Sequence, residues 1–174
     1  MTSSSPKMSI VSYYPGAIGE IVLAHAGYYH KEWGFDLSFE AQVARELSEF
    51  MTAFSPERDG LWIARAESGA FLGSIALDGK PEEGARLRWF IVKPEAQGRG
   101  VGRVLAQYVM EFCRKRHRRV FLWTFRGLES ARAIYESYGF ILAEEHESPQ
   151  WGGLIPEQKY VWTNKELIEK GHCP

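Results

Sequence analysis

Three glycines crowd into residues 97–102, Gln-Gly-Arg-Gly-Val-Gly, and this short segment constrains the chain more than any other. Before it, residues 85–92 are rich in β-branched, aromatic and other apolar side chains and end just ahead of Pro94, which predicts a strand. After it, apolar residues recur at helical spacing from Val101 to Phe112. The sequence therefore predicts a strand, a glycine turn and a long helix in direct succession.

The glycine turn, residues 97–102, is suited to binding an anion. Glycine lets the backbone turn tightly and approach a ligand closely. The first amides of the following helix have no internal partner, and the helix dipole adds partial positive charge there. Arg99 and Arg103 can add full charges. A pyrophosphate is the simplest ligand, and a turn that only connects two elements is the alternative.

Two common phosphate-binding motifs do not fit this turn. A P-loop requires Gly-x-x-x-x-Gly-Lys-Ser/Thr, which the sequence does not contain. A dinucleotide-binding turn requires Gly-x-Gly-x-x-Gly and an acidic residue about 20 positions later. Here the glycines follow Gly-x-Gly-x-Gly, and the next apolar run, which ends at Thr124, has no acidic residue.

Composition narrows the class of protein. The 174 residues suffice for one domain with its own core, and the net charge of −1 argues against a nucleic-acid partner. Two cysteines cannot form a disulfide framework. The sequence shows neither the apolar core of a signal peptide nor an apolar run that could cross a bilayer. We therefore expect a cytoplasmic protein with no membrane partner and no metal site.

The remaining pattern predicts a mixed α/β (α+β) domain with helices packed on a central sheet. Strands are expected over 8–14, 61–66, 70–77, 85–92, 120–124, 140–147 and 159–163, and helices over 17–30, 38–54 with Ser38 as N-cap, from the glycine turn to a basic last turn at 114–119, and 129–138. A loop that contains Trp151 and Gly152 is expected between the last two strands. Residues 1–7 are predicted to be a disordered tail, 8–163 the domain, and 164–174 a short helix or tail.

Two segments together resemble motifs of the GNAT N-acetyltransferases. Val92-x-Pro94 followed by the glycine turn looks like the acyl-CoA-binding motif of that family. Residues 130–140, Ser-Ala-Arg-Ala-Ile-Tyr-Glu-Ser-Tyr-Gly-Phe, are similar to its second motif, a helix with a central Tyr that ends in Gly-Phe. The two stand in the family's order, with one predicted strand between them. A looser likeness to GNAT domains fused to MarR-type regulators is carried by segments 28–29, 34–35, 87–88, 122–124 and 151–152.

The resemblance implies the GNAT acyl-CoA N-acyltransferase fold, a mostly antiparallel mixed sheet with splayed strands flanked by helices. It also implies acetyl-CoA as co-substrate, with pantetheine along the strand before the glycine turn and pyrophosphate on the turn itself. The family often has Asn at the position of Ser130, and Arg132 could instead be a solvated residue on the helix face. The implied cofactor-binding residues are Phe90, Ile91, Val92, Gly98, Arg99, Gly100, Val101, Gly102, Arg103, Ser130 and Arg132.

The implied activity is that of an N-acetyltransferase in which an amine attacks the acetyl thioester directly in a ternary complex. A backbone N–H near Val92 would polarise the thioester carbonyl. Tyr135 is the candidate general acid, because a phenol is protonated at neutral pH. Tyr138 is its nearest competitor, and a core position is the alternative for Tyr135. The sequence does not identify the general base; His25, His30, Glu144, Glu145, His146, Glu157 and a water chain all remain open.

The acceptor is expected to be a small-molecule amine bound by Tyr29, Arg88, Trp123 and Trp151. Arg88 could pair with an acceptor carboxylate, which would favour an amino acid, or it could form a surface salt bridge. A protein N-acetyltransferase acting on a chain terminus or Lys, and a CoA-binding regulatory module without turnover, are the alternative functions. A homodimer is possible for this fold.

Overall fold

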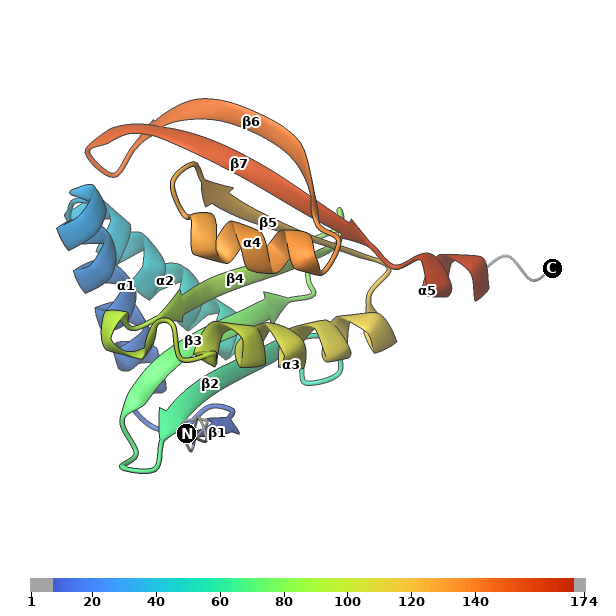
Figure 1. Ribbon diagram of the computed structural model, residues 1–174, viewed down its shortest axis with the longest axis horizontal. Helices are drawn as coiled ribbons and strands as arrows, with labels where there is room; N and C mark the ends of the chain where they lie inside the picture. The colour runs from blue at the N-terminus through green and yellow to red at the C-terminus, as the bar shows by residue number, and fades with distance from the viewer. Residues whose placement is uncertain (1–7, 171–174) are drawn as a thin grey trace, which may run out of the picture.

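The computed structural model describes residues 8–170 (Figure 1). Residues 1–7, predicted to be a tail, and 171–174, the end of the segment predicted over 164–174 to be a short helix or tail, lie outside the described residues. The elements in chain order are β1 (Met8–Val11), α1 (Ala17–Trp33), α2 (Leu37–Thr52), β2 (Gly60–Ala66), β3 (Phe71–Asp78), β4 (Ala85–Val92), a 3-10 turn η1 (Pro94–Ala96), α3 (Val101–Arg116), β5 (Arg119–Phe125), α4 (Glu129–Ser137), β6 (Ile141–Gln150), β7 (Gly153–Thr163) and α5 (Lys165–Lys170).

One seven-stranded sheet organises the described chain, in the order β1-β2-β3-β4-β5-β7-β6. Neighbouring strands are antiparallel except β4 and β5, which are parallel. Helices α1 and α2 cover one face, and α3 and α4 cover the other (Figure 1). This mixed α/β architecture confirms the fold class predicted from the sequence.

The alternation of side chains along the strands produces two cores, one on each face of the sheet. Leu87 of β4 packs in the cluster of α3 and α4, together with Leu105 and Tyr135. Ile91 of the same strand packs in the cluster of α1 and α2, together with Phe39. Successive residues of a strand point to opposite faces, and a bulge in β4 between Leu87 and Ile91 changes this register.

The loop predicted between the last two strands is wrong, because β6 and β7 form one long hairpin. Trp151 and Gly152 alone connect the strands, with φ values of 53° and 87°. Positive φ at both central residues is the geometry that matches the twist of a two-residue hairpin. A tertiary hydrogen bond stabilises the positive φ of Trp151, because the Trp151 carbonyl accepts from the Asp36 N–H at 3.2 Å. The sequence offered no Asn-Gly or Asp-Gly signal for this turn.

The N-cap of α2 is also two residues earlier than predicted. Asp36 caps the helix, because its Oδ1 accepts from the backbone N–H of Ser38 at 2.9 Å. The short carboxylate therefore satisfies an amide of the first turn, which Ser38 cannot do from inside the helix. The backbone N–H of the same Asp36 donates to the Trp151 carbonyl, so the start of α2 lies next to the β6–β7 turn.

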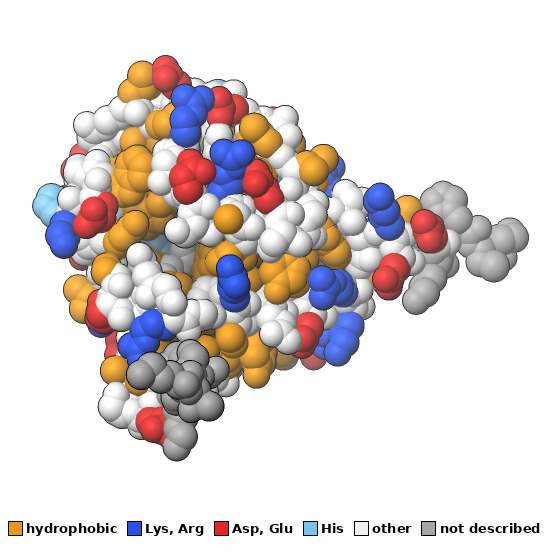
Figure 2. Space-filling view, in the orientation of Figure 1, with side chains coloured by type: hydrophobic (Ala, Val, Ile, Leu, Met, Phe, Trp, Pro, Cys, Tyr) orange, Lys and Arg blue, Asp and Glu red, His pale blue; other side chains and the backbone are white. Residues whose placement is uncertain are grey.

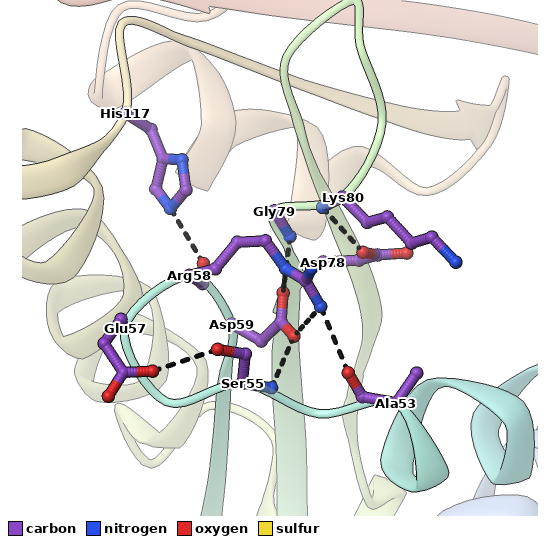
Figure 3. A network of polar contacts seen from close by, with 9 residues as sticks. All are labelled: Ala53, Ser55, Glu57, Arg58, Asp59, Asp78, Gly79, Lys80 and His117. Carbon is purple, nitrogen blue, oxygen red and sulfur yellow. Dashed lines mark hydrogen bonds and ion pairs between the residues drawn. The ribbon is translucent and has the colours of Figure 1, made fainter.

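A buried carboxylate connects the α2–β2 loop to the β3–β4 loop (Figure 3). Asp59 accepts from the backbone N–H groups of Ser55 and Gly79, each at 2.9 Å, and from the guanidinium of Arg58. Burial raises the pKa of Asp59, but these hydrogen bonds outweigh burial and hold the pKa below its usual value. His117, at the end of α3, contacts the Arg58 carbonyl through Nε2 at 3.0 Å. The network therefore joins the α2–β2 and β3–β4 loops to α3.

Candidate functional site

Strands β4 and β5 diverge, and this opens the middle of the sheet. Their parallel pairing comprises only Ala85 with Val120 and Arg86 with Phe121. Beyond these pairs, the edge of β4 that faces β5 has no strand partner within the described residues. The Lys93 N–H donates to the Leu72 carbonyl of β3 at 2.9 Å. Because successive amides of a strand point to opposite edges, the Val92 N–H points to the open side.

A bulge in β4 shapes the same opening. Ala76 of β3 pairs with Arg88, but Ser74 pairs with Ile91, so β4 carries one residue more than β3 between these pairs. Trp89 lies in this bulge with a φ of 45°, in the left-handed region. Its carbonyl accepts from the Ser74 hydroxyl at 2.9 Å, which gives the displaced backbone a partner.

The glycine turn presents bare backbone to solvent. Gly98 and Gly100 have φ values of 71° and 83°, and no atom lies within 4 Å of the position where either would carry a Cβ. Helix α3 begins at Val101 without a side-chain cap, and its first hydrogen bond runs from the Val104 N–H to the Gly100 carbonyl. The amides before Val104 are therefore available to an anionic ligand.

A first cavity of about 920 Å³ extends from the glycine turn to the open edge of β4. Figure 2 shows hydrophobic side chains on this face between α3 and α4, with separate basic residues among them. The cavity is lined from β4, the turn, the first residues of α3, the loop before α4, α4 itself, and α1. The predicted cofactor-binding residues on its wall are Phe90, Ile91, Val92, Gly98, Gly100, Val101, Gly102, Arg103 and Ser130.

A second cavity of about 210 Å³ lies on the α2 side of the opening. Its wall is built from α1, α2, the central part of β4, the end of β5, α4 and the β6–β7 hairpin. Four groups line both cavities and form the boundary between them: Tyr29, Phe90, Leu128 and Ala131. The two cavities therefore adjoin one another at the bulge of β4.

Tyr135 lies on the second cavity close to this boundary. Its side chain is 7% exposed, and its ring lies 5.9 Å from that of Phe90, a boundary residue. Burial, followed by the nearby phenol of Tyr29, raises the pKa of Tyr135 well above its usual range. Its hydroxyl has no hydrogen bond to any residue in the part of the chain that the structure describes. Tyr138, its competitor, lines the first cavity.

His25 is a buried titratable group on the second cavity. Its Nδ1 lies 2.8 Å from the Ile21 carbonyl, so Nδ1 carries the proton and Nε2 has the free lone pair. Burial lowers the pKa of His25 to about 4, although the Ile21 bond opposes this. At neutral pH the ring is therefore uncharged and can accept a hydrogen bond through Nε2.

The remaining predicted residues divide into two groups. Tyr29, Arg88, Trp123 and Trp151 all line the second cavity, so the structure brings the predicted acceptor residues together. Arg88, however, already forms an ion pair with Glu46 of α2. Arg99 and Arg132 line neither cavity, and Arg132 contacts Glu129 and Glu136 of its own helix at 3.6 and 2.8 Å.

Sequence reasoning overlooked several polar residues of the second cavity. Gln42 and Glu46 of α2 line it, and so do Arg86 and Gln150. Arg86 could have been found, because residues two apart on a strand point to the same face and Arg88 was already a candidate. The residues of α2 could not, since nothing in the sequence shows which helix covers the opening.

Within 8–170, His, Cys, Asp and Glu side chains form no group of three that could hold a metal ion. In the same residues, no helix combines the length and apolar character that a bilayer span requires.

Comparison with known proteins places this geometry among acetyltransferases. The family model described as the Acetyltransferase (GNAT) family matches residues 23–140. No curated protein matches the sequence. Similar solved structures include a GNAT-family acetyltransferase from Staphylococcus aureus Mu50, with a TM-score of 0.73, 16% identity, and coverage of 91% of this chain and 100% of that one.

Two further structures show the same fold. An acetyltransferase from Streptococcus agalactiae 2603 has a TM-score of 0.70, 23% identity, and coverage of 90% and 98% of the two chains. A spermidine N-acetyltransferase from Vibrio cholerae, in complex with CoA and spermine, has a TM-score of 0.69, 15% identity, and coverage of 92% and 98%. The finer likeness to domains fused to MarR-type regulators is tested by none of these and stays a prediction.

Proposed function

This chain belongs to the GNAT acetyltransferase family, and from that premise we propose that it transfers the acetyl group of acetyl-CoA to the amine of a small molecule. The observation that carries the proposal is the junction of two cavities at the β4 bulge, with Tyr135 beside it. A long ligand on the glycine turn and a small one near α2 would meet there. Holding both reactants together supplies much of the rate of such a reaction.

The first cavity fits coenzyme A in size and chemistry. The open space at Gly98 and Gly100 leaves room for a pyrophosphate against free amides, and Arg103 adds a cation on the same wall. The unpaired edge of β4 can hydrogen-bond an extended amide-bearing chain as an added strand does. Phe90, Ile91 and Val92 would then hold the pantetheine arm. Ser130 lies on the wall opposite, whereas the ion pairs of Arg132 direct it to its own helix.

The residues at the junction supply the proton chemistry. When bound, acetyl-CoA provides an acetyl thioester, whose carbon–sulfur bond breaks as the bond to the acceptor nitrogen forms. The Val92 N–H, which points to the open side, donates to the carbonyl oxygen of the acetyl group. Tyr135 Oη holds a proton that can pass to the departing sulfur, because a phenol is protonated at neutral pH. His25 Nε2 accepts a hydrogen bond from the acceptor amine, whose released proton leaves through water.

The second cavity favours a small acceptor over a polypeptide. Its volume is about 210 Å³, and a hydrogen bond of 2.8 Å from Trp151 Nε1 to Gln42 Oε1 ties the β6–β7 turn to α2 above it. A protein substrate needs a groove that is open at both ends, and this contact closes one side.

An acetyl-transfer assay across a panel of amines tests the proposal. Purified protein is incubated with acetyl-CoA and each amine, and free CoA is measured with a thiol reagent. We expect amine-dependent thiol release with at least one small amine, above the hydrolysis seen without an acceptor. Calorimetry with CoA alone provides the binding control. CoA binding without transfer to any amine or peptide would point to the regulatory module instead. The absence of CoA binding would contradict both the acetyltransferase and the regulatory module.

A further inference from the structure

A guanidinium without a dedicated counter-ion lines the second cavity. Arg86 lies on β4 at the point where β4 and β5 diverge, and its Nε is buried without a hydrogen-bond partner. No ion pair or hydrogen bond joins its side chain to any other of residues 8–170. Burial, and then the neighbouring charge of Arg88, lowers the pKa of Arg86, although a guanidinium remains charged at any physiological pH.

The acidic groups within electrostatic reach of Arg86 are each held by another residue. Glu46 pairs with Arg88. Asp78 accepts from the backbone N–H of Lys80 at 3.0 Å. Glu83 pairs with Lys159 at 2.7 Å. Arg86 therefore receives long-range attraction from these carboxylates but no direct contact.

A second unsatisfied donor lies on the same cavity. The Nε2 of Gln150, the last residue of β6, is buried and has no hydrogen-bond partner among the described residues. The indole N–H of its neighbour Trp151 donates to Gln42. Of the buried side-chain nitrogens and oxygens in residues 8–170, only Arg86 Nε and Gln150 Nε2 are unpartnered, and both of these residues line this one cavity.

A guanidinium without a counter-ion on the wall of a cavity indicates a ligand that carries negative charge. A buried polar group without a partner is costly, and native proteins leave few of them. A guanidinium binds a carboxylate in a planar fork, and an amide N–H can donate to the same group. The rest of the wall includes Trp89, Trp123 and Trp151, which suit an apolar or aromatic body.

We propose that the acceptor is a small amine that also carries a carboxylate, such as an amino acid, and that Arg86 and Gln150 bind this carboxylate. The inference rests on the proposed acetyl transfer and names its substrate class. It assigns the carboxylate to Arg86 rather than to Arg88, because Glu46 already neutralises Arg88. Arg88 then serves to hold Glu46 and to stack on Trp89, 4.1 Å from its ring centre.

Matched pairs of acceptors test the proposal directly. Each pair consists of an amino acid and the amine that lacks its carboxylate: phenylalanine with phenethylamine, tryptophan with tryptamine, methionine with 3-(methylthio)propylamine. We expect kcat/KM to favour the carboxylate-bearing member of the best pair roughly 10- to 100-fold, the usual effect of a charged hydrogen bond. Arg86→Met should abolish this preference, because it should lower kcat/KM for the carboxylate-bearing member far more than for the plain amine.

Three variants serve as comparisons. Gln150→Leu should reduce the preference in part, and Arg86→Lys should retain some of it, because the charge remains while the fork is lost. Arg116→Met removes a guanidinium from α3 that lines neither cavity and should keep the full preference. Thermal unfolding gives a readout apart from activity: the preferred amino acid should raise the Tm of the natural chain and not that of Arg86→Met.

The outcomes separate this inference from the proposed function. Acetyl transfer with equal or greater kcat/KM for the plain amines, or with spermidine as the best acceptor, would overturn the carboxylate site and leave the acetyltransferase intact. Absence of transfer to every amine, with CoA bound, would overturn the proposed function itself. If Arg86→Met does not fold, Gln150→Leu decides: a preference as large as in the natural chain would refute the site.

Discussion

Two phenols lie on the second cavity, and their environments suit different tasks. Tyr29 lies on the boundary between the cavities, where its ring contacts Phe35, Phe39 and Phe125 at centre distances of 5.2 to 5.6 Å. Burial raises the pKa of Tyr29 above its usual range. Tyr135 lies behind the boundary, with its hydroxyl free of hydrogen bonds to the described residues. Tyr29 therefore forms part of an aromatic wall, and Tyr135 is the phenol that we propose as the acid.

Tyr135→Phe should lower kcat by about 10²-fold, since a positioned acid typically contributes at least that much. The Kd of CoA should change little, because the ring and its packing remain. The matched control is Tyr160→Phe, which removes a hydroxyl from a buried ring 6.4 Å from that of Tyr135 but on neither cavity. Steady-state and single-turnover kinetics measure both variants. If Tyr138→Phe lost the activity instead, the acid would be Tyr138.

The pH profile gives a further check on the same residue. Because the pKa of Tyr135 is raised, its proton should persist through the alkaline range. The kcat of the natural chain should therefore stay level from pH 8 to 10. A decline over this range that is absent in Tyr135→Phe would contradict the raised pKa of Tyr135.

At the scale of elements, the site depends on three backbone irregularities that follow one another around β4. The strand bulges at Trp89, leaves its partner β5 after Arg86, and ends in the glycine turn. Each irregularity leaves backbone groups unpaired, and in a folded protein such groups need another partner. Here the unpaired groups line the first cavity, so the same departures from regular pairing create the binding surface.

Gly100→Ala tests the contribution of the turn. The φ of 83° costs an L-residue roughly 1–2 kcal/mol, although no atom would collide with the new methyl group. We expect the backbone to relax and the first amides of α3 to turn from the ligand, which should raise the Kd of CoA about tenfold. Gly27→Ala is the control, because Gly27 lies within α1 with ordinary φ and equal space. Calorimetric titration with CoA would contradict this account if both variants bound alike.

At the scale of the whole molecule, a structural network lies outside the site. The Asp59 network joins the α2–β2 and β3–β4 loops to the end of α3, and none of its residues lines either cavity. The side chain of Asp59 has no exposed surface, while that of Arg58 is 37% exposed. Asp59 is therefore the member whose loss leaves buried amides without a partner.

Asp59→Ala should reduce the free energy of unfolding by roughly 2–4 kcal/mol at neutral pH, because the Ser55 and Gly79 amides lose their acceptor. Glu57→Ala, at an exposed neighbour in the network, should leave the free energy of unfolding almost unchanged. Since the folded pKa of Asp59 is lowered, its stabilisation is complete above its unfolded pKa of about 3.9 and is lost as pH falls below that value. Denaturant titrations at pH 7 and near pH 3 should show the difference shrink; a constant difference would contradict the linkage.

Local sequence patterns were enough to predict most of the fold. The strand over 85–92 is observed over the same residues, and the helix predicted over 129–138 is observed over Glu129–Ser137, ended by Gly139 with a φ of 90°. These elements could be predicted because their signals lie within a few residues of one another: alternation, helical spacing, and glycines where φ is positive. The β6–β7 turn escaped prediction because Trp151 adopts its positive φ with support from Asp36, a distant residue.

The sequence by itself determined that a glycine turn would join a strand to a helix and leave free amides for an anion, because those properties follow from residue type and spacing alone. Only the tertiary structure decided which polar groups would neutralise one another in the second cavity. Arg88 meets Glu46 across 42 positions, and Trp151 meets Gln42 across 109. Arg86 is left without a partner as a result of those pairings, and no pattern local to β4 distinguishes it from Arg88.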